Sequence, residues 1–93
     1  MLESILGSKS CEQVFIFTLA RGEGYGTEIA EFYDSGLYAI QNQLNRLEDA
    51  NILVSKKVGR ARVYTFKPRY PFLDELKQLL EKAFQFYPEG IRE

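Results

Sequence analysis

The sequence contains no histidine and no tryptophan, and it has only one cysteine and one methionine. Without histidine, the commonest general base and the commonest metal ligand are missing. Hydrolase triads that depend on histidine are therefore excluded, and so is any zinc site with a histidine ligand. Carboxylate chemistry stays open in principle, but no pair of carboxylates stands out. We expect a protein that is not an enzyme and that holds no cofactor and no metal.

A single cysteine, Cys11, cannot form an intramolecular disulfide. We expect it to be a small core or interface residue rather than a redox switch. Long apolar runs are missing as well, since no stretch approaches the ~20 apolar residues of a membrane-spanning helix. The start, MLESILGSKS, has an acidic residue at position 3 and does not resemble a signal peptide. These features predict a cytoplasmic protein that does not associate with membranes.

The composition, with 45% hydrophobic and 27% charged residues among 93, is that of an ordinary globular domain. We expect a single domain over residues 1–93, with a core at 8–70 and a C-terminal dimerisation helix at 71–88. Aromatic residues make up 14% of the chain, which is generous for a core of this size. A second subunit is therefore expected to cover part of the apolar surface.

The first helix is predicted from the run CEQVFIFTLARG, with Ser10 as its N-cap and Gln13 three residues later. Gly22 stands where a left-handed C-terminal residue belongs. Apolar side chains leave this helix almost no polar face, so it must be covered on both sides. In a chain this short, we expect another subunit to supply the second cover.

A second, short helix is predicted from TEIAEFY, beginning at Gly26 or Thr27 after an extended segment around Tyr25. Three of its residues are expected to face the core: Ile29, Ala30 and Tyr33. The preceding glycines have a spacing similar to that of a phosphate-binding loop. They follow a helix rather than a strand, so we interpret them as a helix stop and a turn.

The third helix is predicted from Gly36 to Ala50, with Asp34 or Ser35 able to cap it. Apolar residues at spacings of three, four and three predict one buried stripe of Leu37, Ile40, Leu44 and Leu47. At ~100° per residue, a polar surface lies opposite this stripe. It consists of Ser35, Tyr38, Ala39, Asn42 and Arg46, with Gln43 and Asn45 on the flanks. Two helices joined by a short turn form the helix-turn-helix plan.

Residues 52–69 then predict a β-hairpin that turns at Gly59-Arg60. This segment contains six of the twelve basic residues in the chain, Lys56, Lys57, Arg60, Arg62, Lys67 and Arg69. A charged hairpin is often only a solvated edge that resists aggregation. Between Ala50 and Pro71, however, there is no acidic residue, whereas solvated faces usually mix charges of both signs. The pattern favours binding of a polyanion.

The last helix is predicted to begin at Pro71 and to stop at Pro88. Its broad apolar stripe comprises Phe72, Leu73, Leu76, Leu79, Leu80, Ala83, Phe84 and Tyr87. Asp74 and Glu75 near the start and Lys82 farther along suit the helix dipole. The first and last helices are thus both strongly apolar. We expect them to form a dimer interface through Phe15, Phe17, Leu76, Leu80 and Phe84.

The order of elements (helix, short strand, helix, turn, helix, hairpin, helix) predicts an α+β, mostly α, winged helix-turn-helix. Over residues 8–80 the chain resembles ArsR- and MarR-like bacterial and archaeal transcriptional regulators. The resemblance is carried by an ordered set of segments: Gly26-Thr27-Glu28-Ile29-Ala30, Ala39-Ile40, Gln43-Leu44-Asn45-Arg46-Leu47-Glu48, Ile52-Leu53, Val58-Gly59-Arg60 and Tyr64. It implies a homodimeric regulator that binds double-stranded DNA, with repression favoured. The sequence does not identify an effector ligand.

The resemblance also implies roles for particular residues. The recognition helix would enter the major groove with Ser35, Tyr38, Ala39, Asn42, Gln43 and Arg46. The wing and phosphate contacts would come from Thr27, Lys56, Lys57, Arg60 and Arg62. Asn and Gln side chains suit adenine and Arg suits guanine, whereas Lys and Arg on a hairpin neutralise phosphates without reading sequence. At Thr27, the N-terminus of a helix offers free backbone N–H groups to a phosphate.

Several alternatives stay open. Asn42, Gln43 and Tyr38 are also compatible with ordinary surface or packing positions, and Arg46 with an ion pair to Asp49 or Asp34. Where these regulators often carry Gly-Leu-Ser between the helices, this chain has Asp34-Ser35-Gly36, which brings a negative charge near the DNA backbone. A winged helix that docks an acidic protein partner is the main alternative function. Binding of structured RNA through the same hairpin is a third.

Overall fold

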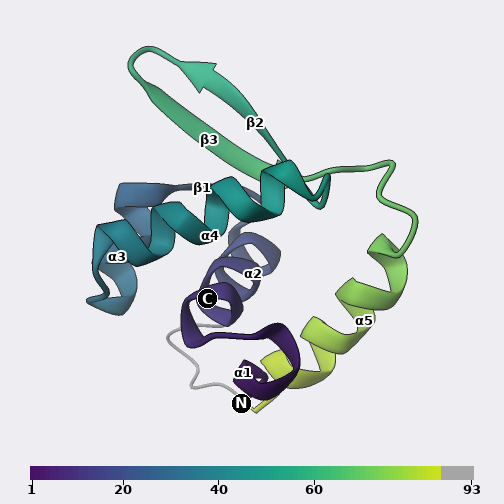
Figure 1. The fold of residues 1–93 in the computed structure, drawn as a ribbon. Helices are drawn as coiled ribbons and strands as arrows, with labels where there is room; N and C mark the ends of the chain where they lie inside the picture. Colours follow the sequence, from purple (N-terminus) through teal and green to yellow (C-terminus); the bar gives the residue numbers. More distant parts are fainter. Residues whose placement is uncertain (87–93) are drawn as a thin grey trace.

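The computed structural model describes residues 1–86, which form five helices and a three-stranded antiparallel sheet (Figure 1). In chain order the elements are α1 (Glu3–Leu6), α2 (Lys9–Arg21), β1 (Gly24–Tyr25), α3 (Gly26–Tyr33), α4 (Leu37–Asp49), β2 (Leu53–Val58), β3 (Ala61–Phe66) and α5 (Leu73–Phe84). The predicted winged helix-turn-helix is confirmed. Helix α1 was not predicted, and Tyr87 and Pro88 lie outside the described residues.

The start of α2 differs from the prediction. Its N-cap is Ser8, not Ser10, and the Ser8 hydroxyl accepts a hydrogen bond from the Cys11 backbone N–H at 3.1 Å. Gln13 takes no part in capping, because its side-chain oxygen accepts a hydrogen bond from the Ser35 hydroxyl at 2.9 Å. At the other end, Gly22 has φ of +84° and ends the helix as predicted.

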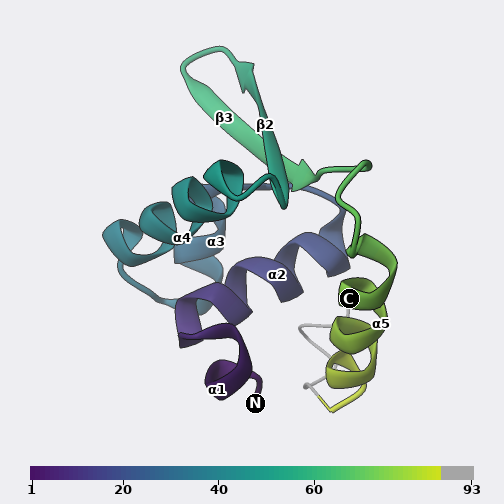
Figure 2. The same ribbon diagram turned by 45° about the vertical axis from the view of Figure 1, so that its right-hand side comes forward.

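Helix α2 lies in the middle of the molecule, with α3 and α4 on one side and α5 on the other (Figure 2). Its Phe15 ring stacks on Phe66 of β3 at 6.0 Å between ring centroids, and its Phe17 ring meets Phe32 of α3 edge-on at 5.6 Å. The chain's own elements therefore cover this helix. The expectation that a second subunit must cover it is wrong.

Three of the five residues predicted for the dimer interface are buried inside the chain: Phe15, Phe17 and Leu80. They belong to the hydrophobic core, so in this fold they offer no surface to a partner and that prediction is corrected. Leu76 and Phe84 are partly buried against the same core. The exposed apolar residues of the C-terminal segment are instead Phe72, Leu79 and Phe86. Helix α5 begins at Leu73, two residues after Pro71.

The turn between α3 and α4 also corrects the capping prediction. Asp34 has φ of +51° and ends α3, and neither Asp34 nor Ser35 caps α4, whose N-cap is Gly36. Three residues of the predicted stripe are buried: Ile40, Leu44 and Leu47. Leu37 is 47% exposed, because the first turn of α4 lies beside an open hollow between the two helices.

The sheet has the order β1–β3–β2. Ser55 lies opposite Tyr64 and Lys57 lies opposite Arg62 in the β2–β3 hairpin. Gly59, at φ of +63°, forms the predicted turn with Arg60. The hairpin stands away from the helices in both ribbon views (Figures 1 and 2). At the base of the sheet, Leu53, Tyr64 and Phe66 contribute to the core or pack against it.

Candidate nucleic-acid interface

Helix α4 presents most of its predicted reading residues to solvent. Tyr38 is 80% exposed, and Ala39, Asn42 and Arg46 are exposed as well. Ser35 and Gln43 are half-buried. Because Ile40, Leu44 and Leu47 fix the opposite side of the helix in the core, the orientation of this polar face is set by packing.

Arg46 and Gln43 are joined on this face. The Nε and Nη2 atoms of Arg46 donate hydrogen bonds to Gln43 Oε1 at 3.1 and 2.8 Å. The alternative of an ion pair between Arg46 and Asp49 or Asp34 is therefore not what the structure shows. A Gln side chain needs its amide oxygen to pair bidentately with adenine. Gln43 must consequently release Arg46 before it can read a base in that way, and the two residues act as one unit.

The β2–β3 hairpin is the wing of this fold, and its outer part is fully open to solvent. Residues 56–62 are all exposed, and they include Lys56, Lys57, Arg60 and Arg62. Within residues 1–86, none of these four cations forms a salt bridge. Arg62 donates to the Ser55 hydroxyl at 3.2 Å, which leaves its charge unneutralised at the contact. The hairpin thus carries a concentrated positive charge on a chain whose net charge is -1.

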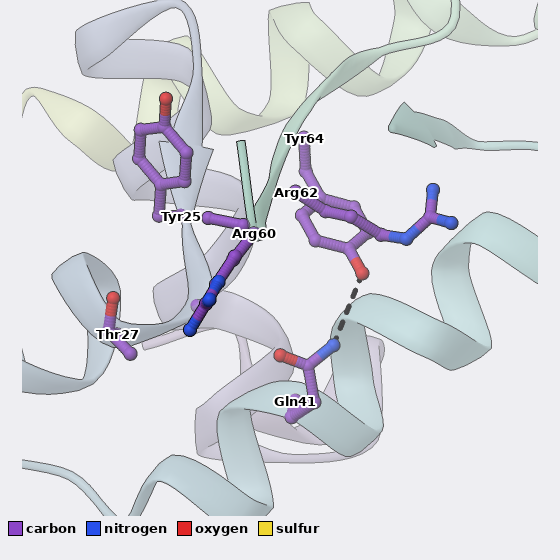
Figure 3. Close-up of a pocket in the computed structure, with 8 residues that line it drawn as sticks. Tyr25, Thr27, Gln41, Arg60, Arg62 and Tyr64 are labelled. Carbon is purple, nitrogen blue, oxygen red and sulfur yellow. Dashed lines mark hydrogen bonds between the residues drawn. The ribbon is translucent and has the colours of Figure 1, made fainter. Parts of the chain in front are cut away.

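The wing, the start of α3 and helix α4 enclose a hollow of about 350 Å³ (Figure 3). Its lining comprises Tyr25, Gly26, Thr27, Gln41, Arg60, Ala61, Arg62 and Tyr64. In Figure 3 the Arg60 side chain extends toward α3 and α4, whereas Arg62 turns the other way. The structure thereby brings together Thr27 and Arg60, which lie far apart in the sequence. Gln41, the neighbour of Asn42, lines the same hollow.

The N-terminus of α3 is already approached by a carboxylate. The Tyr25 backbone N–H donates to Glu28 Oε1 at 3.3 Å. Glu28 therefore satisfies one of the N–H groups at the helix start and places a negative charge next to Thr27. A phosphate at Thr27 would compete with this carboxylate. This competition was not predicted, although Glu28 in the first turn of the helix is a local signal for it.

Two polar contacts between α4 and the base of the wing were also missed. Gln41 Nε2 donates to the Tyr64 hydroxyl at 3.1 Å, and the Ser55 hydroxyl donates to Glu48 Oε2 at 2.5 Å. Gln41 also donates to Asn45 Oδ1 at 3.0 Å, and this pair is readable from the spacing of four residues along a helix. No sequence signal indicates the contacts to the wing, because each joins residues of two different elements whose docking is not recorded in a local spacing.

Cys11 is buried in the core, as predicted. Burial raises the pKa of its thiol, which keeps it in the protonated, less reactive form at neutral pH. Burial also raises the pKa of Tyr33 to about 12, and its hydroxyl has no hydrogen-bond partner among residues 1–86. In the same part of the chain, no three Cys, Asp or Glu side chains are grouped to hold a metal ion. None of its helices has the length and apolar character needed to cross a membrane.

No protein-family model and no curated protein sequence matches the chain. Its fold is similar to that of reduced HlyU from Vibrio cholerae N16961, with a TM-score of 0.68 and 17% identity over 92% of this chain and 84% of that one. It is similar to AntR, an antimony-specific transcriptional repressor, with a TM-score of 0.68 and 24% identity over 99% and 78% of the two chains. YusO from Bacillus subtilis matches with a TM-score of 0.61 and 22% identity over 97% and 72%. The predicted resemblance to ArsR- and MarR-like winged-helix regulators is thus confirmed for the fold.

Proposed function

We propose that this protein is a transcriptional regulator that binds double-stranded DNA in a sequence-specific manner as a homodimer. One observation carries the proposal: the basic wing and the polar helix α4 border the same hollow, through Arg60 and Gln41. Two elements that suit the two parts of a DNA duplex, its grooves and its phosphates, therefore share one surface. The fold supports a regulatory rather than an enzymatic role.

In this proposal α4 lies in the major groove and reads base edges. Asn42 is exposed and suits adenine, while Tyr38 and Ala39 offer apolar surface to thymine methyl groups. Arg46 contacts guanine once it separates from Gln43, or the two side chains contact the bases while they are still hydrogen-bonded to each other. Ser35 lies at the start of this surface, where its hydroxyl is held by Gln13.

The wing supplies affinity that does not depend on sequence. Lys56, Lys57, Arg60 and Arg62 neutralise phosphates next to the site that α4 reads, and Arg60 at the tip reaches the flanking minor groove. In the proposal Thr27 contacts a phosphate beside Arg60, with which it lines one hollow, in competition with Glu28. Because the net charge of the chain is -1, the local field of the wing rather than the overall charge attracts DNA.

The dimer is proposed to form through the C-terminal segment. Phe72, Leu79 and Phe86 are exposed: Leu79 lies in α5, Phe72 directly precedes the helix and Phe86 follows its C-cap, so apolar side chains are open to solvent at both ends and in the middle of this segment. Leu76 and Phe84 of the same helix are partly buried and pack against the core. Two recognition helices in a dimer would read two half-sites about one helical turn apart. Sedimentation equilibrium checks this part, because a dimer has twice the chain mass of 10.8 kDa.

Fluorescence anisotropy with duplexes selected from a random-sequence library tests DNA binding. We expect Arg60→Ala with Arg62→Ala to weaken binding to the selected and to unrelated duplexes alike. In the proposed dimer the two substitutions remove four phosphate contacts, so the slope of log affinity against log salt should fall by ~4, since each contact contributes ~1.

A matched control removes two cations outside the wing and α4. Lys9 and Arg21 are both exposed at the ends of α2, so Lys9→Ala with Arg21→Ala changes the net charge equally and should leave affinity and slope close to wild type. Equal weakening by the two double variants would contradict a specific role for the wing. Failure of the wild-type protein to enrich any duplex sequence would contradict the proposed function itself.

A further inference from the structure

Gln41 connects helix α4 to the wing through a single amide group. Both hydrogens of its Nε2 are engaged. One is donated to the Tyr64 hydroxyl at 3.1 Å (Figure 3), and the other to Asn45 Oδ1 at 3.0 Å. With both N–H groups engaged, the orientation of the amide is determined. The same side chain therefore contacts strand β3 and a residue on the exposed surface of α4.

The surroundings hold Gln41 in place. A Cβ atom at position 26 would lie 2.7 Å from Gln41 Oε1, so a side chain there would displace the Gln41 amide. The Tyr64 ring is buried in the core, with 2% of the residue exposed, and it gives the hydroxyl a rigid anchor. Gln41 is thus fixed between the start of α3 and the base of β3.

The wing needs such a contact, because its outer residues 56–62 are all exposed and only its base adjoins the helices. Strand β1 pairs with β3 only at Gly24–Tyr64 and Tyr25–Val63, so beyond these pairs the hairpin has two strands and is soft on its own. Each strand has 6 residues, so the hairpin is a lever ~20 Å long, and a tilt of ~10° at its base moves its tip by ~3 Å. A shift of that size breaks a hydrogen bond to a phosphate.

We infer that Gln41 and Tyr64 are positioning residues, whose hydrogen bond sets the inclination of the wing so that Arg60 reaches the duplex that α4 reads. The contact of Ser55 with Glu48 supports the second strand in the same way. This inference rests on the proposed function, since it concerns how the two DNA-binding elements are held in register. Neither Gln41 nor Tyr64 needs to touch DNA for this role.

Tyr64→Phe removes the hydroxyl and keeps the buried ring, and a first measurement uses the protein free of DNA. We expect residual dipolar couplings to show that the tip, residues 56–62, changes its orientation relative to the helices or averages over several. The matched control is Tyr33→Phe, which removes a hydroxyl that has no hydrogen-bond partner among residues 1–86. Gln41→Met provides a second variant that removes the same hydrogen bond from its other side.

A second measurement uses duplexes selected by the wild-type protein from a random-sequence library. We expect Tyr64→Phe to weaken binding ~3- to 10-fold, the effect of about one hydrogen bond to a phosphate, while urea unfolding shows that the variant is still folded under the assay conditions. In a double-mutant cycle, Arg60→Ala should cost less affinity in the Tyr64→Phe background than in the wild type. Asn42→Ala should cost the same in both, because Asn42 belongs to α4 rather than to the wing.

An unchanged wing orientation in both Tyr64→Phe and Gln41→Met would overturn the inference, whether or not the protein binds DNA. Additive effects of Tyr64→Phe and Arg60→Ala would also overturn it, since the wing would then work without the hydrogen bond. If the wild-type protein selects no duplex, the proposed function fails, and the measurement on the free protein still decides whether the pair positions the wing.

Discussion

Helices α2 and α4 are each 13 residues long, and they use their surfaces in opposite ways. Helix α2 is enclosed by the rest of the chain, and eight consecutive residues from Cys11 to Thr18 are buried. Helix α4 buries only Ile40, Leu44 and Leu47 and leaves its remaining surface open or half-open. This fold therefore buries α2 almost completely and leaves α4 with a polar surface that is open to solvent.

We expect the largest effect on stability from a substitution in the middle of α2. Ile16 is 0% exposed, and Ile16→Ala should lower the free energy of unfolding by ~2–5 kcal/mol, because it removes buried methyl groups and leaves a cavity. Urea unfolding followed by circular dichroism measures this loss. For a small domain this is a large share of the total stability, so the variant should unfold at a clearly lower urea concentration than wild type. A loss below ~1 kcal/mol would show that α2 is less tightly enclosed than its burial indicates.

Asn42→Ala on the open side of α4 should leave the stability unchanged and weaken the base preference. We expect its free energy of unfolding to stay within ~0.5 kcal/mol of wild type, because an exposed side chain is removed. Its preference for the selected duplex over single-base variants should weaken by ~1–3 kcal/mol. Competition anisotropy measures that preference, with Gln78→Ala on α5 as a control that removes an exposed amide elsewhere. Loss of stability without loss of preference would break the division of roles between the two helices.

A smaller effect is expected where α2 begins. Ser8→Ala removes the hydroxyl that accepts from the Cys11 N–H and should destabilise the protein by ~1 kcal/mol. Ser10→Ala, two residues later inside the helix, is the matched control and should change stability by less than ~0.5 kcal/mol. Thermal unfolding of both variants compares them directly. The reverse ranking would restore Ser10 as the N-cap and contradict the observed start of the helix.

Local patterns predicted most of the secondary structure. The spacing of Ile40, Leu44 and Leu47 was enough to predict α4 and its buried stripe, and Gly59 was enough to predict the hairpin turn. Gly22 likewise ended α2 as expected. These signals work because a helical stripe, a helix end and a tight turn are each decided within a few neighbouring residues. Helix starts were less predictable, since Ser8 and Ser10 offer the same hydroxyl group as an N-cap.

The proposed DNA-binding and dimer surfaces were harder to predict. The exposed positions of Asn42 and Arg46 were expected, but the bond between Arg46 and Gln43 and the approach of Glu28 to the start of α3 were not. Phe15 and Phe17 were expected at a dimer interface and are buried in the core. An apolar helix shows by its sequence that it must be covered. It does not show whether the same chain or a second one provides the cover.

The sequence by itself determined which segments are helical, where the hairpin turns and how much positive charge the wing carries, because these properties depend on neighbouring residues. Only the tertiary structure decided that α2 is enclosed by its own chain, that Arg60 and Thr27 line one hollow, and that Gln41 meets Tyr64. Those contacts depend on how whole elements dock. Docking is set by the summed fit of many side chains, and no local spacing records that sum.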